Sequence, residues 1–192
     1  MKKLLLLKNI VLICTMAFFV SCADNAEKKD SKEIAEDRNE EKFNKPGEKD
    51  AQVLVDAYSG SMFEMQLSDS VKIFSTDDDV KTLASAMSGS HSSINSEIKQ
   101  LASKKAISLP AAISTDEAKK ISDYKNKKAS DLNNDYVDAL IDDHKKTIAL
   151  FEKAAADCTD NDIKSWFAGV LPELRKHLDM TITVQEKLKT KK

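Results

Sequence analysis

The sequence predicts an all-α protein: a four-helix bundle in which a long crossover carrying a short helix joins helices 2 and 3. Three observations predict it. Apolar residues recur three and four positions apart over four long segments, which is the period of helices with one buried face. No sustained alternation of apolar and polar residues indicates a strand. The joins within each half are short, whereas the join between the halves, about residues 105–129, is long.

The first two helices form one expected hairpin. The first spans about residues 51–75, and its inward positions are Val53, Ala57, Gly60, Glu64, Leu67, Val71 and Phe74. The second follows Thr76 and Asp79, which have the spacing of a capping box that starts a helix. Its inward positions are Val80, Leu83, Met87, His91, Ile94, Ile98 and Leu101.

The last two helices form the second expected hairpin. The third begins near Ser130, with inward positions at Leu132, Tyr136, Leu140, His144, Ile148 and Phe151. The fourth begins at Thr159–Asp162, another capping-box pattern, with inward positions at Ile163, Phe167, Val170, Leu174, His177 and Val184. Pro172 lies inside this helix and predicts a kink just before His177, because proline lacks the N–H that a helix interior uses.

The long join contains Leu109-Pro110 and then Ser114 to Glu117, a capped start that predicts a short extra helix. A helix of about 28 residues is about 42 Å long, and the join is long enough to run back along it. Ferritin-like bundles connect their two hairpins by such a crossover, so we expect a ferritin-like topology. A plain up-down bundle with a decorated loop is the alternative.

The N-terminus has the features of a signal peptide: a basic start, then an apolar run from Ile10 to Val20 that is too short for a transmembrane helix. The run ends in Phe19-Val20-Ser21-Cys22, which resembles the signal of bacterial lipoproteins, in which the cysteine is lipidated. We therefore expect a lipoprotein signal peptide over residues 1–21, and lipid such as palmitate on Cys22. Ordinary secretion with Cys22 free is the alternative.

Residues 22–50 are expected to be the lipidated cysteine and a disordered tether, because this stretch has too little apolar surface to fold. Residues 51–190 are then the four-helix domain. The expected location is the cell envelope, anchored to a membrane, most simply the outer membrane, with the domain in the periplasm or at the cell surface. Membrane contact is thus through the lipid, and the sequence indicates no particular protein partner.

Charge and cysteine content exclude several classes of function. Without residues 1–21 the chain has 27 basic and 32 acidic residues, a net charge of −5, which argues against nucleic-acid binding. Cys158 is then the only cysteine besides Cys22, so no intramolecular disulfide is expected. The sequence has no phosphate-binding glycine loop, no Cys-x-x-Cys, no Gly-x-Ser-x-Gly and no His-Glu-x-x-His.

Four ionisable residues are predicted to meet inside the bundle. Glu64, His91, His144 and His177 each occupy an inward position near the middle of a different long helix. A midpoint stays at the same height whichever way its helix runs, so the four side chains are expected in one layer. Buried charge is costly unless paired or bound to metal, and imidazole with carboxylate suits zinc, iron, copper or manganese.

Two further carboxylates are candidate ligands: Asp143 beside His144, and Glu173 four residues before His177 on the same helix face. The Glu-x-x-His pairs of di-iron proteins are missing, and only one carboxylate occupies a core position, so ferroxidase chemistry is not expected. The alternative to a metal site is a structural or pH-responsive network of buried histidines.

Three of the four glycines, Gly60, Gly89 and Gly169, lie in helix interiors near this layer. Each costs roughly 1 kcal/mol relative to alanine. They allow either close approach of the helices or room for a ligand, and ordinary tolerance of glycine is the alternative.

The chain resembles a bacterial envelope family known as domain of unknown function 4142. The matching motifs are Met87-x-x-x-His91-x-x-x-Asn95-x-Glu97, Tyr136 with Asp143-His144, and Leu171-Pro172-x-Leu174-x-x-His177-Leu178. They cover about residues 50–182, and the Leu-Pro…His element is the most specific. Members often have aspartate before the histidine of helix 2, where this chain has Ser90. The resemblance implies a ferritin-like fold and leaves the activity open.

The sequence therefore predicts a lipid-anchored bacterial envelope protein of unknown activity with a central Glu/His layer that is a candidate site for a transition-metal ion. The alternative is a non-catalytic structural or pH-responsive envelope protein with a buried histidine network. Enzymatic activity is left undecided and the evidence weighs against it, because an oxidoreductase centre needs more carboxylates than the layer provides.

Overall fold

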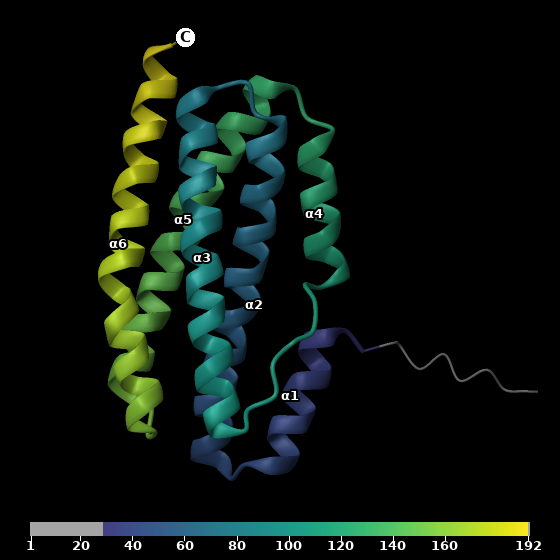
Figure 1. Cartoon of the computed structure of the whole chain (residues 1–192), viewed down its shortest axis with the longest axis vertical. Coiled ribbons are helices and arrows are strands. Elements are labelled where there is room, and N and C mark those ends of the chain that lie inside the picture. The colour runs from purple at the N-terminus through teal and green to yellow at the C-terminus, as the bar shows by residue number, and fades with distance from the viewer. Residues whose placement is uncertain (1–28, 192) are drawn as a thin grey trace, which may run out of the picture.

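The computed structural model describes residues 29–191, and these residues form six helices and no strand, which confirms the all-α class (Figure 1). The helices are α1 (Ser31–Lys42), α2 (Lys45–Phe74), α3 (Asp78–Lys105), α4 (Thr115–Lys125), α5 (Ala129–Asp157) and α6 (Asn161–Thr190). The predicted signal peptide and Cys22 lie outside the described residues. Within the described part of the chain, no helix combines the length and apolar character needed to span a membrane.

The four long helices lie side by side as two hairpins, α2 with α3 and α5 with α6 (Figure 1). The hairpins pack together through α3 against α6 and α2 against α5, while α1 and α4 both pack on α2. Each hairpin has the short turn that the sequence predicts, over residues 75–77 and 158–160. Helix α6 is helical throughout Asn161–Thr190, with Pro172 inside it.

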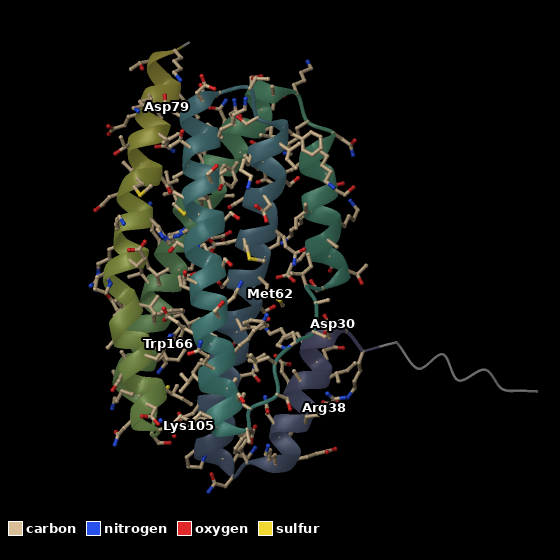
Figure 2. All side chains as sticks on the ribbon, in the orientation of Figure 1. Asp30, Arg38, Met62, Asp79, Lys105 and Trp166 are labelled. Carbon is tan, nitrogen blue, oxygen red and sulfur yellow. The ribbon has the colours of Figure 1, made fainter. Side chains whose placement is uncertain are left out.

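Polar contacts at one end of the molecule establish the directions of the helices. Lys191, after α6, forms an ion pair of 2.9 Å with Asp79 at the start of α3. At the same end, the Ser75 hydroxyl after α2 donates a hydrogen bond of 2.7 Å to Asn133 in the first turns of α5. Helix α5 thus begins at the end where α3 begins, and residues 106–128 with α4 run the length of the molecule. Asp79 and Lys105 are labelled near opposite ends of α3 in Figure 2.

The helix starts agree with the predicted capping signals to within a residue or two. Ser114 caps α4 in a capping box with Glu117, as predicted. The predicted caps of α3 and α6 are wrong by one residue. Asp77 and Asp160 cap these helices, each accepting two backbone N–H bonds. A carboxylate at the cap satisfies these donors and also opposes the positive end of the helix dipole.

The prediction of a disordered tether is wrong for residues 31–50, because α1 and the first turn and a half of α2 occupy them. Polar contacts, and not an apolar face, order α1. The buried Asn39 side chain donates to the Ser108 carbonyl at 2.9 Å and accepts the Ser108 N–H at 2.7 Å. Such pairing cannot be inferred from the apolar pattern. Within α2, Gly60 and Phe74 are exposed although both were placed on the inward face.

The buried side chains form two separate apolar clusters, one toward each end of the molecule. Along α2 the first cluster reaches Met62, which Figure 2 labels, and the second begins at Leu67. Along α6 the first cluster ends at Leu174 and the second begins at Val184. The same interruption occurs in α3 between residues 87 and 94 and in α5 between residues 141 and 151. One polar layer therefore crosses all four long helices.

Candidate metal centre

The polar layer contains the four residues predicted from the sequence. Glu64 comes from α2, His91 from α3, His144 from α5 and His177 from α6, and all four side chains are buried. The three imidazole rings lie 5.3–5.9 Å apart between centroids. One nitrogen from each ring lies within 4.8 Å of the others, and Glu64 Oε2 lies 3.2 Å from His91 Nε2. The three histidines therefore converge as predicted, and the Glu64 carboxylate lies beside His91 and His144 without belonging to the group of donor atoms within 4.8 Å.

Each histidine uses one ring nitrogen for a hydrogen bond to a group outside the cluster, and His144 Nδ1 also lies 3.5 Å from Glu64 Oε2. His144 Nδ1 donates to the Leu140 carbonyl oxygen at 2.9 Å, and His177 Nε2 donates to Glu173 Oε1 at 3.2 Å. His91 Nδ1 lies 3.0 Å from Ser61 Oγ. The Ser61 hydroxyl donates to the His91 carbonyl at 3.4 Å, so its oxygen is free to accept from Nδ1. Metal-bound histidines are held in this way by an outer partner that fixes the tautomer.

These outer bonds leave lone pairs on the nitrogens that face inward. A carbonyl and a carboxylate only accept, so the protons of neutral His144 and His177 lie on Nδ1 and Nε2 respectively. His144 Nε2 and His177 Nδ1 then face each other at 3.3 Å, each with a lone pair. His91 Nε2 and Glu64 Oε2 are likewise buried without a hydrogen-bond partner. Facing lone pairs repel unless a proton or a cation lies between them.

The spacing of the inward atoms fits a single small cation. In a tetrahedral site with bonds of about 2.0–2.1 Å, neighbouring ligand atoms are about 3.3 Å apart. The pairs His144 Nε2–His177 Nδ1 and His91 Nε2–Glu64 Oε2 are at 3.3 and 3.2 Å. Three nitrogens at most 4.8 Å apart need to move inward by about 0.7 Å each to reach metal-ligand distances.

The electrostatics of the layer favour an anionic Glu64 and a neutral His177. Burial raises the pKa of Glu64, but the His91, His144 and His177 imidazoles together outweigh burial and lower it. Burial, and then repulsion from His91 and His144, lowers the pKa of His177 from 6.5 to about 4. At neutral pH, His177 therefore has the uncharged form that metal binding requires.

The two additional carboxylates are not inward ligands in this geometry. Glu173 is 42% exposed and bonds to the outer nitrogen of His177, so it orients the ring and does not face the centre. Asp143 is half-buried and forms an ion pair of 3.8 Å with Lys146. Burial and the Glu64 charge raise the pKa of Asp143. Among the described residues, it does not belong to the group whose donor atoms converge.

The helix glycines do not bring backbones close together. A Cβ added at Gly60, Gly89 or Gly169 meets no atom within 4 Å, so the expectation of close helix approach is wrong. Gly89 and Gly169 line a groove of about 630 Å³ between α3 and α6 that reaches Glu173. Gly60 lines a smaller cavity beside Glu64. Both the groove and the cavity provide space for a ligand, as the sequence predicts.

The outer partners of His91 and His144 were missed by the sequence reasoning. Ser61 lies three residues before Glu64 on the same face of α2, and this spacing is a signal that was available. The Leu140 carbonyl lies four residues before His144. Backbone carbonyls carry no sequence signal, so this partner is visible only in the structure.

Comparison with protein families supports the resemblance drawn from the three motifs. A family model described as "Domain of unknown function (DUF4142)" matches residues 35–184. The chain belongs to this family. No curated protein and no solved structure matches the chain. The DUF4142 match begins within α1 and ends within α6, so it includes all four residues of the layer.

Proposed function

We propose that this DUF4142 protein binds one transition-metal ion between His91, His144, His177 and Glu64, at the centre of a ferritin-like four-helix bundle. One observation carries the proposal: the inward nitrogens of His144 and His177 face each other at 3.3 Å while both outer N–H groups are already used. A cation between the two nitrogens removes the repulsion of their lone pairs, because both lone pairs then bind the cation.

The donor set supports a borderline metal. Three neutral imidazoles and one carboxylate suit zinc, copper or iron, and manganese less well, because manganese prefers oxygen ligands. The single inward carboxylate supports a binding or storage role in preference to oxidation by a di-iron centre, which uses about four carboxylates. The helix order, with α3 and α5 running in the same direction, supports the ferritin-like assignment.

We propose further that the chain is a lipoprotein of the cell envelope, with lipid on Cys22. The support is the sequence alone: a basic start, a short apolar run and Phe19-Val20-Ser21-Cys22. Growth of the bacterium with labelled palmitate tests this. Label is expected in the native chain, and none in the Cys22→Ala chain. Equal labelling of both chains would refute lipidation at Cys22.

Metal content of the purified protein tests the central proposal. Protein dialysed separately with zinc, copper, iron or manganese is analysed for metal per chain. We expect about one bound ion for the preferred metal, and His144→Ala and His177→Ala variants that bind at least ten-fold more weakly. Asp143→Asn is the matched control, since Asp143 neighbours His144 but does not face the cluster, and it should bind like the native protein.

A non-catalytic, pH-responsive histidine network is the second candidate, favoured by the Glu64–His91 pair at 3.2 Å. In that case a proton on His91 Nε2, and not a metal ion, bridges the two atoms. The metal analysis separates the candidates. Absence of bound metal under all four conditions would refute the first proposal, and folding that weakens on mild acidification would then support the second.

A further inference from the structure

A small cavity lies beside the cluster, between α2 and α5, with a volume of about 40 Å³. Glu64 and His91 line its inner part together with apolar side chains. Its rim contains the exposed Gly60 and the half-buried Asp56 and Thr147. The volume corresponds to roughly one to three water molecules. The cavity thus connects the surface of the bundle with the proposed metal ligands.

Two buried polar atoms, Glu64 Oε2 and His91 Nε2, lie 3.2 Å apart at this cavity. Glu64 Oε2 and His91 Nε2 belong to side chains that are more than nine-tenths buried, and neither atom has a hydrogen bond. In the proposed site both atoms bind the metal ion, so the ion lies beside this cavity and a ligand in the cavity reaches it. The groove on the opposite side, between α3 and α6, does not serve in this way. It reaches Glu173, whose bond to His177 Nε2 lies between the groove and the cluster.

We infer that this cavity holds a fifth coordination position, in addition to the four protein ligands, where a small anion or water of one to three non-hydrogen atoms binds the metal ion. The inference rests on the proposed metal site. A divalent ion with three neutral imidazoles and the Glu64 carboxylate carries a net charge of +1, so a monoanion completes its neutralisation. The apolar part of the wall (Ala57, Ile94, Leu150, Phe151 and Leu174) excludes larger or more strongly hydrated ligands.

Azide binding to the cobalt-loaded protein tests the inference, because ligands added to cobalt change its visible absorption. We expect a saturable absorbance change on azide titration of the native protein. Gly60→Leu places a side chain at the rim, where nothing lies within 4 Å of the new Cβ. This variant should bind cobalt normally and azide at least ten-fold more weakly.

Gly169→Leu is the matched control, because Gly169 is also a helix-interior glycine with open space around it but lines the α3/α6 groove. It should respond to azide like the native protein. Normal cobalt uptake without an azide response, or an unchanged response in Gly60→Leu, would overturn the open position alone. Failure of the native protein to take up cobalt would overturn the metal site and this inference together.

Discussion

The metal-free protein should lose stability on mild acidification, and His177 sets the expected size of the effect. Its pKa is about 4 in the folded protein against 6.5 for a free imidazole, because burial and the neighbouring imidazoles oppose its charge. The unfolded chain therefore binds a proton as the pH falls through 6.5, while the folded protein does not. The contribution of His177 to stability is therefore present above pH 6.5 and is lost as the pH falls toward 4. Between pH 7 and pH 5 the loss is about 2 kcal/mol.

Urea unfolding at a series of pH values, with chelator present, measures this effect. For a domain of this size about 2 kcal/mol corresponds to a fall of about 4–8 °C in Tm. Glu64 does not account for a change in this window. Because the pKa of Glu64 is lowered from 4.5, its contribution to stability is present above pH 4.5 and is lost only as the pH falls below that value. In His177→Gln the loss of unfolding free energy between pH 7 and pH 5 should be smaller by about 2 kcal/mol than in the native protein. Native stability that stays constant or rises between pH 7 and pH 5 would refute the reasoning.

Two further predictions concern residues outside the inward ligand set. Glu173→Ala should weaken metal binding about 10–100-fold in a competition titration, because the outer partner of His177 Nε2 is lost. Lys176→Ala, which removes an exposed lysine 3.6 Å from Glu173, is its control and should change affinity little. Asp50→Ala should lower the free energy of unfolding, measured in urea, by about 3 kcal/mol. The buried Asp50 carboxylate accepts the backbone N–H groups of Thr159 and Asp160, and the variant leaves both donors without this partner. Asp157→Ala, at an exposed position in the same region, should change the free energy of unfolding little, and equal effects of the two variants would contradict the role given to Asp50.

The convergence of the histidines was predictable because it depends on only two properties of the sequence. The helical period places His91, His144 and His177 on inward faces, and their positions near helix midpoints give them one height in the bundle. The capped start of α4 at Ser114 was predictable for a similar reason, since its signal lies within four residues.

The features that could not be predicted depend on contacts distant in sequence. The order of residues 31–50 depends partly on Asn39 bonding to Ser108, and no local pattern reveals such a partner. The direction in which Glu173 points was also not predictable. The four-residue spacing places it on the face of His177, but only the rotamers show that it reaches the outer nitrogen. Asp143, beside a ligand in sequence, points about 100° around the helix from it.

X-ray absorption at the zinc edge of the zinc-loaded protein tests the central claim most directly, because it reports which atoms surround the ion. The account predicts three imidazole nitrogens and one carboxylate oxygen from the protein at about 2.0–2.1 Å, with at most one further ligand from water or a small anion. It also predicts loss of imidazole scattering in His144→Ala. A zinc ion surrounded by oxygen alone, or a spectrum unchanged in that variant, would contradict a metal centre between α2, α3, α5 and α6.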